Sequence, residues 1–281
     1  MAVALTFTDS AANVLNLHDL TNFRLLALLG AGIGDVAHQA VATPLQDGET
    51  YIRTLLLPRY LTVQIALIGT TFDNLQTQRR SLVTRLNPKL GLGTLKWTPI
   101  AAGTVYALDC LVMRGAEFSD HKSATLDFAT VQFYAPDPTW YNTTQTNTDI
   151  TVPDGGLEFA ITFPITFSVN SASSVINNTG DVVSYPVVSL AGPFTGFQIK
   201  NSTTGKYINL PSLAVLTGET LTIDMKQKTI EVGGTSVLSY LTTDSEFWPL
   251  ATGNNTVLAT ISAKDAAVTV NVDWYVRYLG V

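Results

Sequence analysis

Asn178-Thr179-Gly180 opens a stretch, ending at Asn255, in which turn residues recur at short intervals. The clusters that follow are Tyr185-Pro186-Val187, Gly192-Pro193, Ile199-Lys200-Asn201, Thr203-Thr204-Gly205, Gly218-Glu219, Ile223-Asp224, Phe247-Trp248-Pro249-Leu250 and Gly253-Asn254-Asn255. Glycine, proline, asparagine and aspartate favour turns, and the gaps between the clusters are short runs of apolar and β-branched residues. The stretch therefore predicts a meander of short strands.

The composition points to a well-packed chain with a sparsely charged surface. The 281 residues suffice for two domains, and 46% are hydrophobic whereas only 14% are charged. Such a surface indicates that part of it is buried against partners. The net charge of −6 argues against sequence-specific reading of duplex DNA, although a mildly acidic lumen would let DNA pass without adhering.

No segment has the features of a membrane span or a signal peptide. No apolar run approaches the roughly 20 residues that a span needs. The first residues, Met1-Ala2-Val3-Ala4-Leu5-Thr6, lack a basic start and a long apolar segment, so we expect synthesis in a cytoplasm. Cys110 is the only cysteine, which excludes an internal disulfide, and its strand-like surroundings predict a buried side chain.

The first half of the chain predicts strands around one helix. We expect strands over residues 1–9, 51–68, 94–100, 104–113 and 123–134. In the last of these the apolar phase switches near Phe128-Ala129, which indicates either a bulge there or two shorter strands. The helix is expected over residues 72–86, capped by Thr71 or Asp73 and stopped by Asn87-Pro88. Its predicted buried stripe consists of Leu75, Leu82, Val83 and Leu86.

The run Gly32-Ile33-Gly34-Asp35-Val36-Ala37 fits the dinucleotide fingerprint G-x-G-x-x-A. That fingerprint needs a helix behind it and then a second parallel strand. Here Thr43-Pro44 and Asp47-Gly48 interrupt the segment where the helix or strand should continue. A loop between strands is therefore the preferred interpretation.

Motifs of common catalytic and metal sites are missing. The sequence lacks G-x-S-x-G, H-E-x-x-H and G-x-x-x-x-G-K-[ST]. Three histidines, His18, His38 and His121, are far apart and lie in loop-like contexts. We predict no catalytic residue, no metal ligand and no cofactor.

Motifs in both halves, in the same order along the chain, resemble those of the siphophage distal tail protein family. In the second half these are the turn clusters quoted above. In the first half they are Asp47-Gly48-Glu49, Leu57-Pro58-Arg59-Tyr60, Arg79-Arg80, Leu86-Asn87-Pro88, Gly91-Leu92-Gly93 and Pro136-Asp137-Pro138-Thr139-Trp140. Residues 10–45 match this pattern least well.

The resemblance implies a mainly β chain of two domains. Residues 1–140 would form a β-rich, ring-forming domain with one helix, and residues 141–281 a galectin-like β-sandwich. Six copies would close a ring in the virion tail that joins the tail tube protein to tail-tip, hub or tape-measure proteins. DNA would pass through the ring without specific binding. The candidate contacts between subunits are Arg59, Arg79, Arg80 and Arg85, and the alternative is a solvated helix face.

Two other functions stay open. In a carbohydrate-binding adhesin, Trp140 and Trp248 could stack on sugar rings, because both lie in turn-like stretches; packing in a core or an interface is the simpler role. A glycan-cleaving enzyme would need an acidic pair, which the sequence does not identify.

Overall fold

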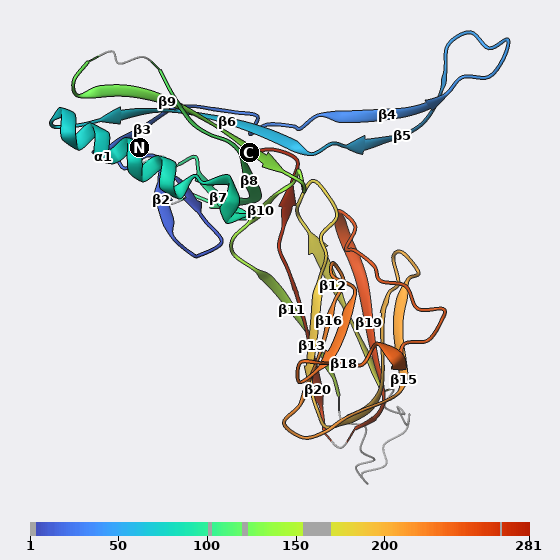
Figure 1. Ribbon diagram of the computed structural model, residues 1–281. Coiled ribbons are helices and arrows are strands. Elements are labelled where there is room, and N and C mark those ends of the chain that lie inside the picture. The colour runs from blue at the N-terminus through green and yellow to red at the C-terminus, as the bar shows by residue number, and fades with distance from the viewer. Residues whose placement is uncertain (1–3, 101–102, 120–122, 154–169, 265) are drawn as a thin grey trace, which may run out of the picture. The chain divides into compact units, whose positions relative to one another are not determined.

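The computed structural model of the protein describes residues 4–100, 103–119, 123–153, 170–264 and 266–281. The chain divides into two compact units: unit 1 is Met1–Thr143 with Tyr278–Val281, and unit 2 is Thr144–Arg277. The predicted boundary after residue 140 lies close to this division, but the last four residues belong to unit 1 rather than to the second domain. In the described residues one α-helix accompanies many strands, which confirms the mainly β fold class (Figure 1).

Unit 1 contains the helix and the N-terminal strands. Its elements are β1 (Ala4–Thr8), β2 (Val14–Asn16), β3 (Phe23–Leu29), β4 (Val36–Val41), β5 (Thr50–Leu56), β6 (Arg59–Ile68), α1 (Phe72–Arg85), the 3-10 helix η1 (Pro88–Leu90), β7 (Gly93–Thr98), β8 (Tyr106–Phe118), β9 (Leu126–Ala135) and β10 (Trp140–Asn142). The short strand β21 (Arg277–Tyr278) pairs with β10.

One sheet forms the body of unit 1. Its strands run in the order β2-β1-β7-β8-β9-β6-β3, so β2 and β3 are the ends of this path. The rings of Phe7 on β1 and Phe133 on β9 lie 5.2 Å apart, centroid to centroid. The two halves of the sheet therefore face each other across a shared apolar core, which also includes Leu61, Val63 and Ile65 of β6.

Helix α1 begins and ends where the sequence predicts. The side chain of Thr71 accepts a hydrogen bond from the backbone N–H of Asn74, and the helix stops just before Asn87-Pro88. Leu75, Leu82 and Leu86 are buried in the core. Val83 is instead 53% exposed, and Gln78 takes an inward position, donating to the side chains of Asn22 and Asn74 and to the carbonyl of Ile68.

The predicted bulge at Phe128-Ala129 is wrong. Strand β9 alternates without interruption between half-buried and buried residues and keeps a continuous register with β6. The apparent phase switch arises because Asp127, a carboxylate, occupies an inward position that periodicity assigns to an apolar residue. The register shifts lie on β8 instead, between Val112 and Arg114 and between Arg114 and Glu117.

The described residues of unit 2 form two sheets. Strands β11 (Thr146–Val152), β20 (Val268–Trp274), β13 (Val187–Ala191), β16 (Thr220–Asp224), β17 (Thr229–Val232) and β18 (Thr235–Ser236) form one, in this order. Strands β12 (Ser171–Asn178), β19 (Gly253–Lys264), β14 (Phe194–Asn201) and β15 (Tyr207–Val215) form the other, and the 3-10 helix η2 is Leu238–Tyr240. Alternate residues of β19 and β20 are buried, as expected of strands with one face toward a core.

The turn clusters that predicted this meander are held by buried asparagines. Asn178, Asn201 and Asn255 are each at most 1% exposed. The Nδ2 of Asn201 donates to Oδ1 of Asn255 at 3.1 Å, and Asn255 in turn bonds the backbone of Ala251 and Gly253. Because these amides satisfy backbone groups of the loops, they fix the turns between the strands.

Candidate functional site: arginines, hairpin arm and helix face

Arg59 is an internal anchor of unit 1 and not a subunit contact. Its side chain is 2% exposed, and its Nε and Nη2 donate to the carbonyl oxygens of Pro138 and Leu279 at 2.6 and 2.5 Å. Its Nη1 donates to the carbonyls of Gly30, at 2.6 Å, and Gly32. Burial lowers the pKa of this guanidinium, which nevertheless remains charged because arginine does not deprotonate in proteins.

Arg79 is also held inside unit 1. Its Nε lies 3.4 Å from Oδ2 of Asp127, a fully buried carboxylate, and its guanidinium lies 4.3 Å from the centroid of the Phe118 ring. The prediction that Arg59 contacts a neighbouring subunit is therefore corrected, whereas a subunit contact by Arg79, whose side chain is 22% exposed, stays a prediction. Both side chains turn inward because they compensate buried polar groups that an apolar side chain would leave unpaired.

Arg80 and Arg85 lie on the exposed side of α1. They line a depression of about 510 Å³ together with Gln76, Thr77, Ser81 and Thr84. We call these six residues the helix face. Arg85 donates to the carbonyl of Val14, and this bond fixes the position of the Arg85 side chain. Arg80 lies one helical turn earlier and is exposed. Of the four predicted arginines, these two are the exposed ones.

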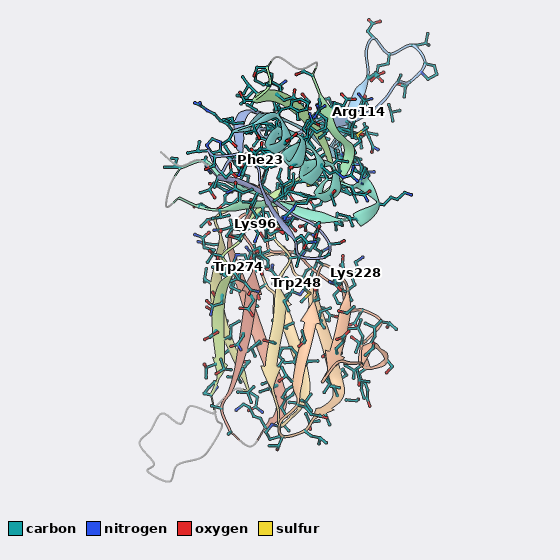
Figure 2. The ribbon with its side chains drawn as sticks, turned by 60° about the vertical axis from the view of Figure 1, so that its left-hand side comes forward. Phe23, Lys96, Arg114, Lys228, Trp248 and Trp274 are labelled. Atoms are coloured by element: carbon teal, nitrogen blue, oxygen red, sulfur yellow. The ribbon has the colours of Figure 1, made fainter. Side chains whose placement is uncertain are left out.

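Trp140 and Trp248 are both fully buried. The Nε1 of Trp140 donates to the carbonyl of Ala31 at 3.1 Å, and Trp248 lies within unit 2 (Figure 2). The prediction that they stack on sugar rings is corrected, because neither ring offers a face to a ligand. Nearby prolines give both tryptophans a turn-like sequence context, but the large apolar rings are buried in the cores.

The glycine-rich run at residues 30–34 is a loop between strands, as preferred from the sequence. Strand β4 follows it, without a helix, and Gly30 has a φ of 87°. The loop carbonyls bind Arg59, and the carbonyl of Ala31 also accepts the N–H of Val281 at 3.1 Å. Instead of cradling a phosphate, the loop is fastened to the core of unit 1 by its own carbonyl oxygens.

Strands β4 and β5 form a separate two-stranded sheet that projects from the rest of unit 1 (Figure 1). We call residues 35–57 the arm. Its base is closed by a hydrogen bond of 2.9 Å from the N–H of Leu57 to the carbonyl of Asp35. Every residue of β5 is exposed. The large apolar side chains of the arm that remain exposed are Val36, Val41, Leu45, Tyr51, Ile52, Leu55, Leu56 and Leu57.

The arm is the feature that the sequence analysis missed. The sequence predicts strands over residues 51–68, and such runs of apolar and β-branched residues usually turn one face toward a core. A signal was present: Leu55, Leu56 and Leu57 are consecutive, so both faces of the strand carry leucine and neither can be the polar one. Such a strand either lies between two layers or awaits a partner.

Metal and membrane features are absent from the described residues. There, no group of three or more His, Cys, Asp and Glu side chains is placed to hold a metal ion, and no helix is long and apolar enough to cross a membrane. His18 accepts the backbone N–H of Leu25, His38 bonds Thr54 in the arm, and His121 lies outside the described residues. Burial raises the pKa of the Cys110 thiol to about 12.

Comparison with known proteins agrees with this architecture. Residues 179–278 match the family model of the siphovirus-type tail component, C-terminal domain. The resemblance to siphophage distal tail proteins is confirmed. The crystal structure of SPP1 Dit, described as a paradigm of the hub adsorption apparatus in phages that infect Gram-positive bacteria, shares the fold with a TM-score of 0.71 and 16% identity, over 96% of this chain and 98% of that one.

A second set of similar structures comes from a phage baseplate. Structures of the phage P2 baseplate in its activated conformation, with Ca and with Sr, each match with a TM-score of 0.53 and 10% identity, over 97% of this chain and 98% of theirs. No curated protein matches the sequence. At these identities the likeness to solved structures establishes a common fold with the Dit protein and the baseplate chains.

Proposed function

We propose that the protein is a structural component of a phage tail, in which copies of the chain close a ring, six to a ring, between the tail tube and the tail tip. The arm is the observation that carries this proposal. An isolated two-stranded hairpin is at best marginally stable in water, and this one exposes apolar side chains on both faces. A partner that covers the arm would stabilise the hairpin and remove its apolar side chains from water.

A second copy of the chain is the partner that the sheet topology favours. Strand β3 ends the sheet path of unit 1, leads through the loop of residues 30–34 into the arm, and exposes Leu26 and Leu29. An open, apolar edge next to an apolar arm makes one continuous surface for association. Since the arm of one copy would seat on a different surface of the next, the contact is heterologous and generates a ring when the rotation closes.

The charge of the chain fits a passage for DNA. Each copy carries a formal net charge of −6, so a ring of copies would be strongly acidic and would repel phosphates. In this proposal the ring is a connector without catalytic activity, located in the virion tail and made in the host cytoplasm. It would contact the tail tube protein on one side and tail-tip, hub or tape-measure proteins on the other.

Arm variants test the role of the apolar surface. We expect replacement of Leu55 and Leu56 by serine to convert the assembled species in sedimentation velocity into monomer, with an unchanged circular dichroism spectrum. The matched control replaces Leu238, which is exposed to a similar degree (45%) in unit 2, by serine and should leave the assembly intact. Assembly that is equally strong in both variants would contradict the proposed role of the arm.

A further inference from the structure

We propose that the tip of the arm of one copy docks on the helix face of the next, with acidic residues of the tip against Arg80 and Arg85. This inference rests on the proposed ring and names the surface that receives the arm. We call residues 42–49 the arm tip.

The arm tip presents one apolar side chain beside two carboxylates. Leu45 is fully exposed at a φ of 69°, and Asp47 and Glu49 follow it. The loop is braced from within: the N–H of Gln46 donates to the carbonyl of Thr43 at 3.1 Å, and its Nε2 donates to Oγ1 of Thr50 at 2.9 Å. The conformation of the arm tip is therefore fixed before docking, which reduces the conformational entropy lost on binding.

Within the described part of the chain, the carboxylates of the tip, Asp47 and Glu49, form no ion pair. On the arm itself the one arginine, Arg53, donates to the side chain of Gln39 at 2.5 Å. The tip thus offers two unpaired negative charges to a neighbour.

The helix face has the complementary character. Its depression is lined by two arginines and by the short polar side chains of Thr77, Ser81 and Thr84, without a carboxylate. Short side chains leave room for Leu45, and a guanidinium can bind a carboxylate through two parallel hydrogen bonds. Because Arg85 is already held by the carbonyl of Val14, its position is fixed in advance.

The arm tip and the helix face lie at opposite ends of unit 1. Figure 1 shows the arm extending from one end of the unit, while α1 lies at the other, away from β4 and β5. The tip therefore does not reach the helix face of its own chain, and pairing must join two copies head to tail. That is the arrangement that closes rings.

Charge reversal with rescue tests the pairing. The pair Arg80→Glu with Arg85→Glu and the pair Asp47→Lys with Glu49→Lys are made separately and then combined in one chain, and assembly of each full-length protein is followed by sedimentation velocity. We expect each reversal to raise the concentration for half-assembly about tenfold or more, and the combined chain to return close to wild type, because attractive charges meet again. Lys228→Glu, a surface change in unit 2, is the matched control and should have no effect (Figure 2).

Other outcomes would contradict either the docking inference or the proposed ring. If the wild type assembles and the reversals leave assembly unchanged, or the combined chain stays as weak as the single reversals, the docking inference is overturned while the ring stands. If the reversal of Arg80 and Arg85 weakens binding of a DNA duplex in a filter assay but not assembly, the helix face serves nucleic acid and the inference is likewise overturned. A wild type that does not assemble contradicts the proposed function itself.

Discussion

The Nη2 of Arg59 donates a hydrogen bond of 2.5 Å to the carbonyl oxygen of Leu279, 220 positions away in the sequence. The same guanidinium bonds the glycine-rich loop before the arm and the proline-rich segment after β9. One buried cation thus joins the C-terminal residues to the base of the arm, so the tail of the chain is part of the folded core of unit 1.

The Arg59 network predicts a large loss of stability when it is removed. Arg59→Met would leave several buried carbonyls without donors, and we expect unit 1 to lose about 3–5 kcal/mol of unfolding free energy. Arg24→Met, at an exposed position of β3, is the control and should change the value by less than about 0.5 kcal/mol. Denaturant titration measures both; a loss for Arg59→Met as small as that of the control would contradict the network.

The neighbouring arginines Arg79 and Arg80 should behave differently. Arg79→Ala leaves the buried carboxylate of Asp127 without its ion-pair partner, and we expect a loss of about 2–4 kcal/mol. Arg80→Ala removes an exposed charge and should alter the unfolding free energy of the monomer by less than about 0.5 kcal/mol. Adding Asp127→Asn to Arg79→Ala should recover part of the loss, which a double-mutant cycle measures. Equal effects of the two alanine variants would refute the assignment of Arg79 to the interior.

Cys110 provides a reporter for the opening of unit 1. Its side chain is fully buried and its thiol pKa is raised to about 12, so at pH 8 the reactive thiolate is both scarce and inaccessible. We expect labelling by a thiol reagent to be slow in the native protein and rapid in denaturant, with a rate that increases in Arg59→Met. Fast labelling of the native wild-type protein would show that the core around Cys110 is open.

Gly280 should tolerate no side chain, unlike Gly32, which it contacts. A Cβ at Gly280 would lie 2.6 Å from the backbone carbonyl carbon of Gly32, whereas a Cβ at Gly32 meets nothing within 4 Å. Gly280→Val should therefore destabilise unit 1 by about 1–3 kcal/mol, the usual effect of overpacking. Gly32→Ala should be nearly neutral. Thermal unfolding followed by Cys110 labelling compares the two variants. Equal melting curves would argue against close packing of Gly280 on Gly32.

Local sequence signals predicted much of the fold, and the exceptions have a common cause. Thr71 and Asn87-Pro88 determine the ends of α1 through short-range interactions, so the helix could be predicted well. Gln78 and Asp127 are buried in contact with partners far away in the sequence, Asn22 and Arg79. Periodicity treats such residues as exposed, since it contains no information on partners distant in the chain.

The candidate site was predictable only in part for the same reason. The sequence alone does not distinguish buried arginines from exposed ones. In the structure, Arg59 and Arg79 bind groups inside unit 1, whereas Arg80 and Arg85 are exposed. The arm was not anticipated because apolar strands usually lie on a core, and this one turns its leucines to solvent. Its stability in the virion would come from neighbours that a single sequence does not describe.

Native mass spectrometry of the full-length protein at increasing concentration tests the central claim most directly. The account predicts an assembly of six copies whose rings have an open centre in negative-stain images. A variant with residues 37–55 replaced by a short glycine-asparagine turn, which keeps the hydrogen bond between Asp35 and Leu57, should remain monomeric. A wild-type protein that stays monomeric at the highest concentration, or closes as a two-fold dimer, would contradict the account.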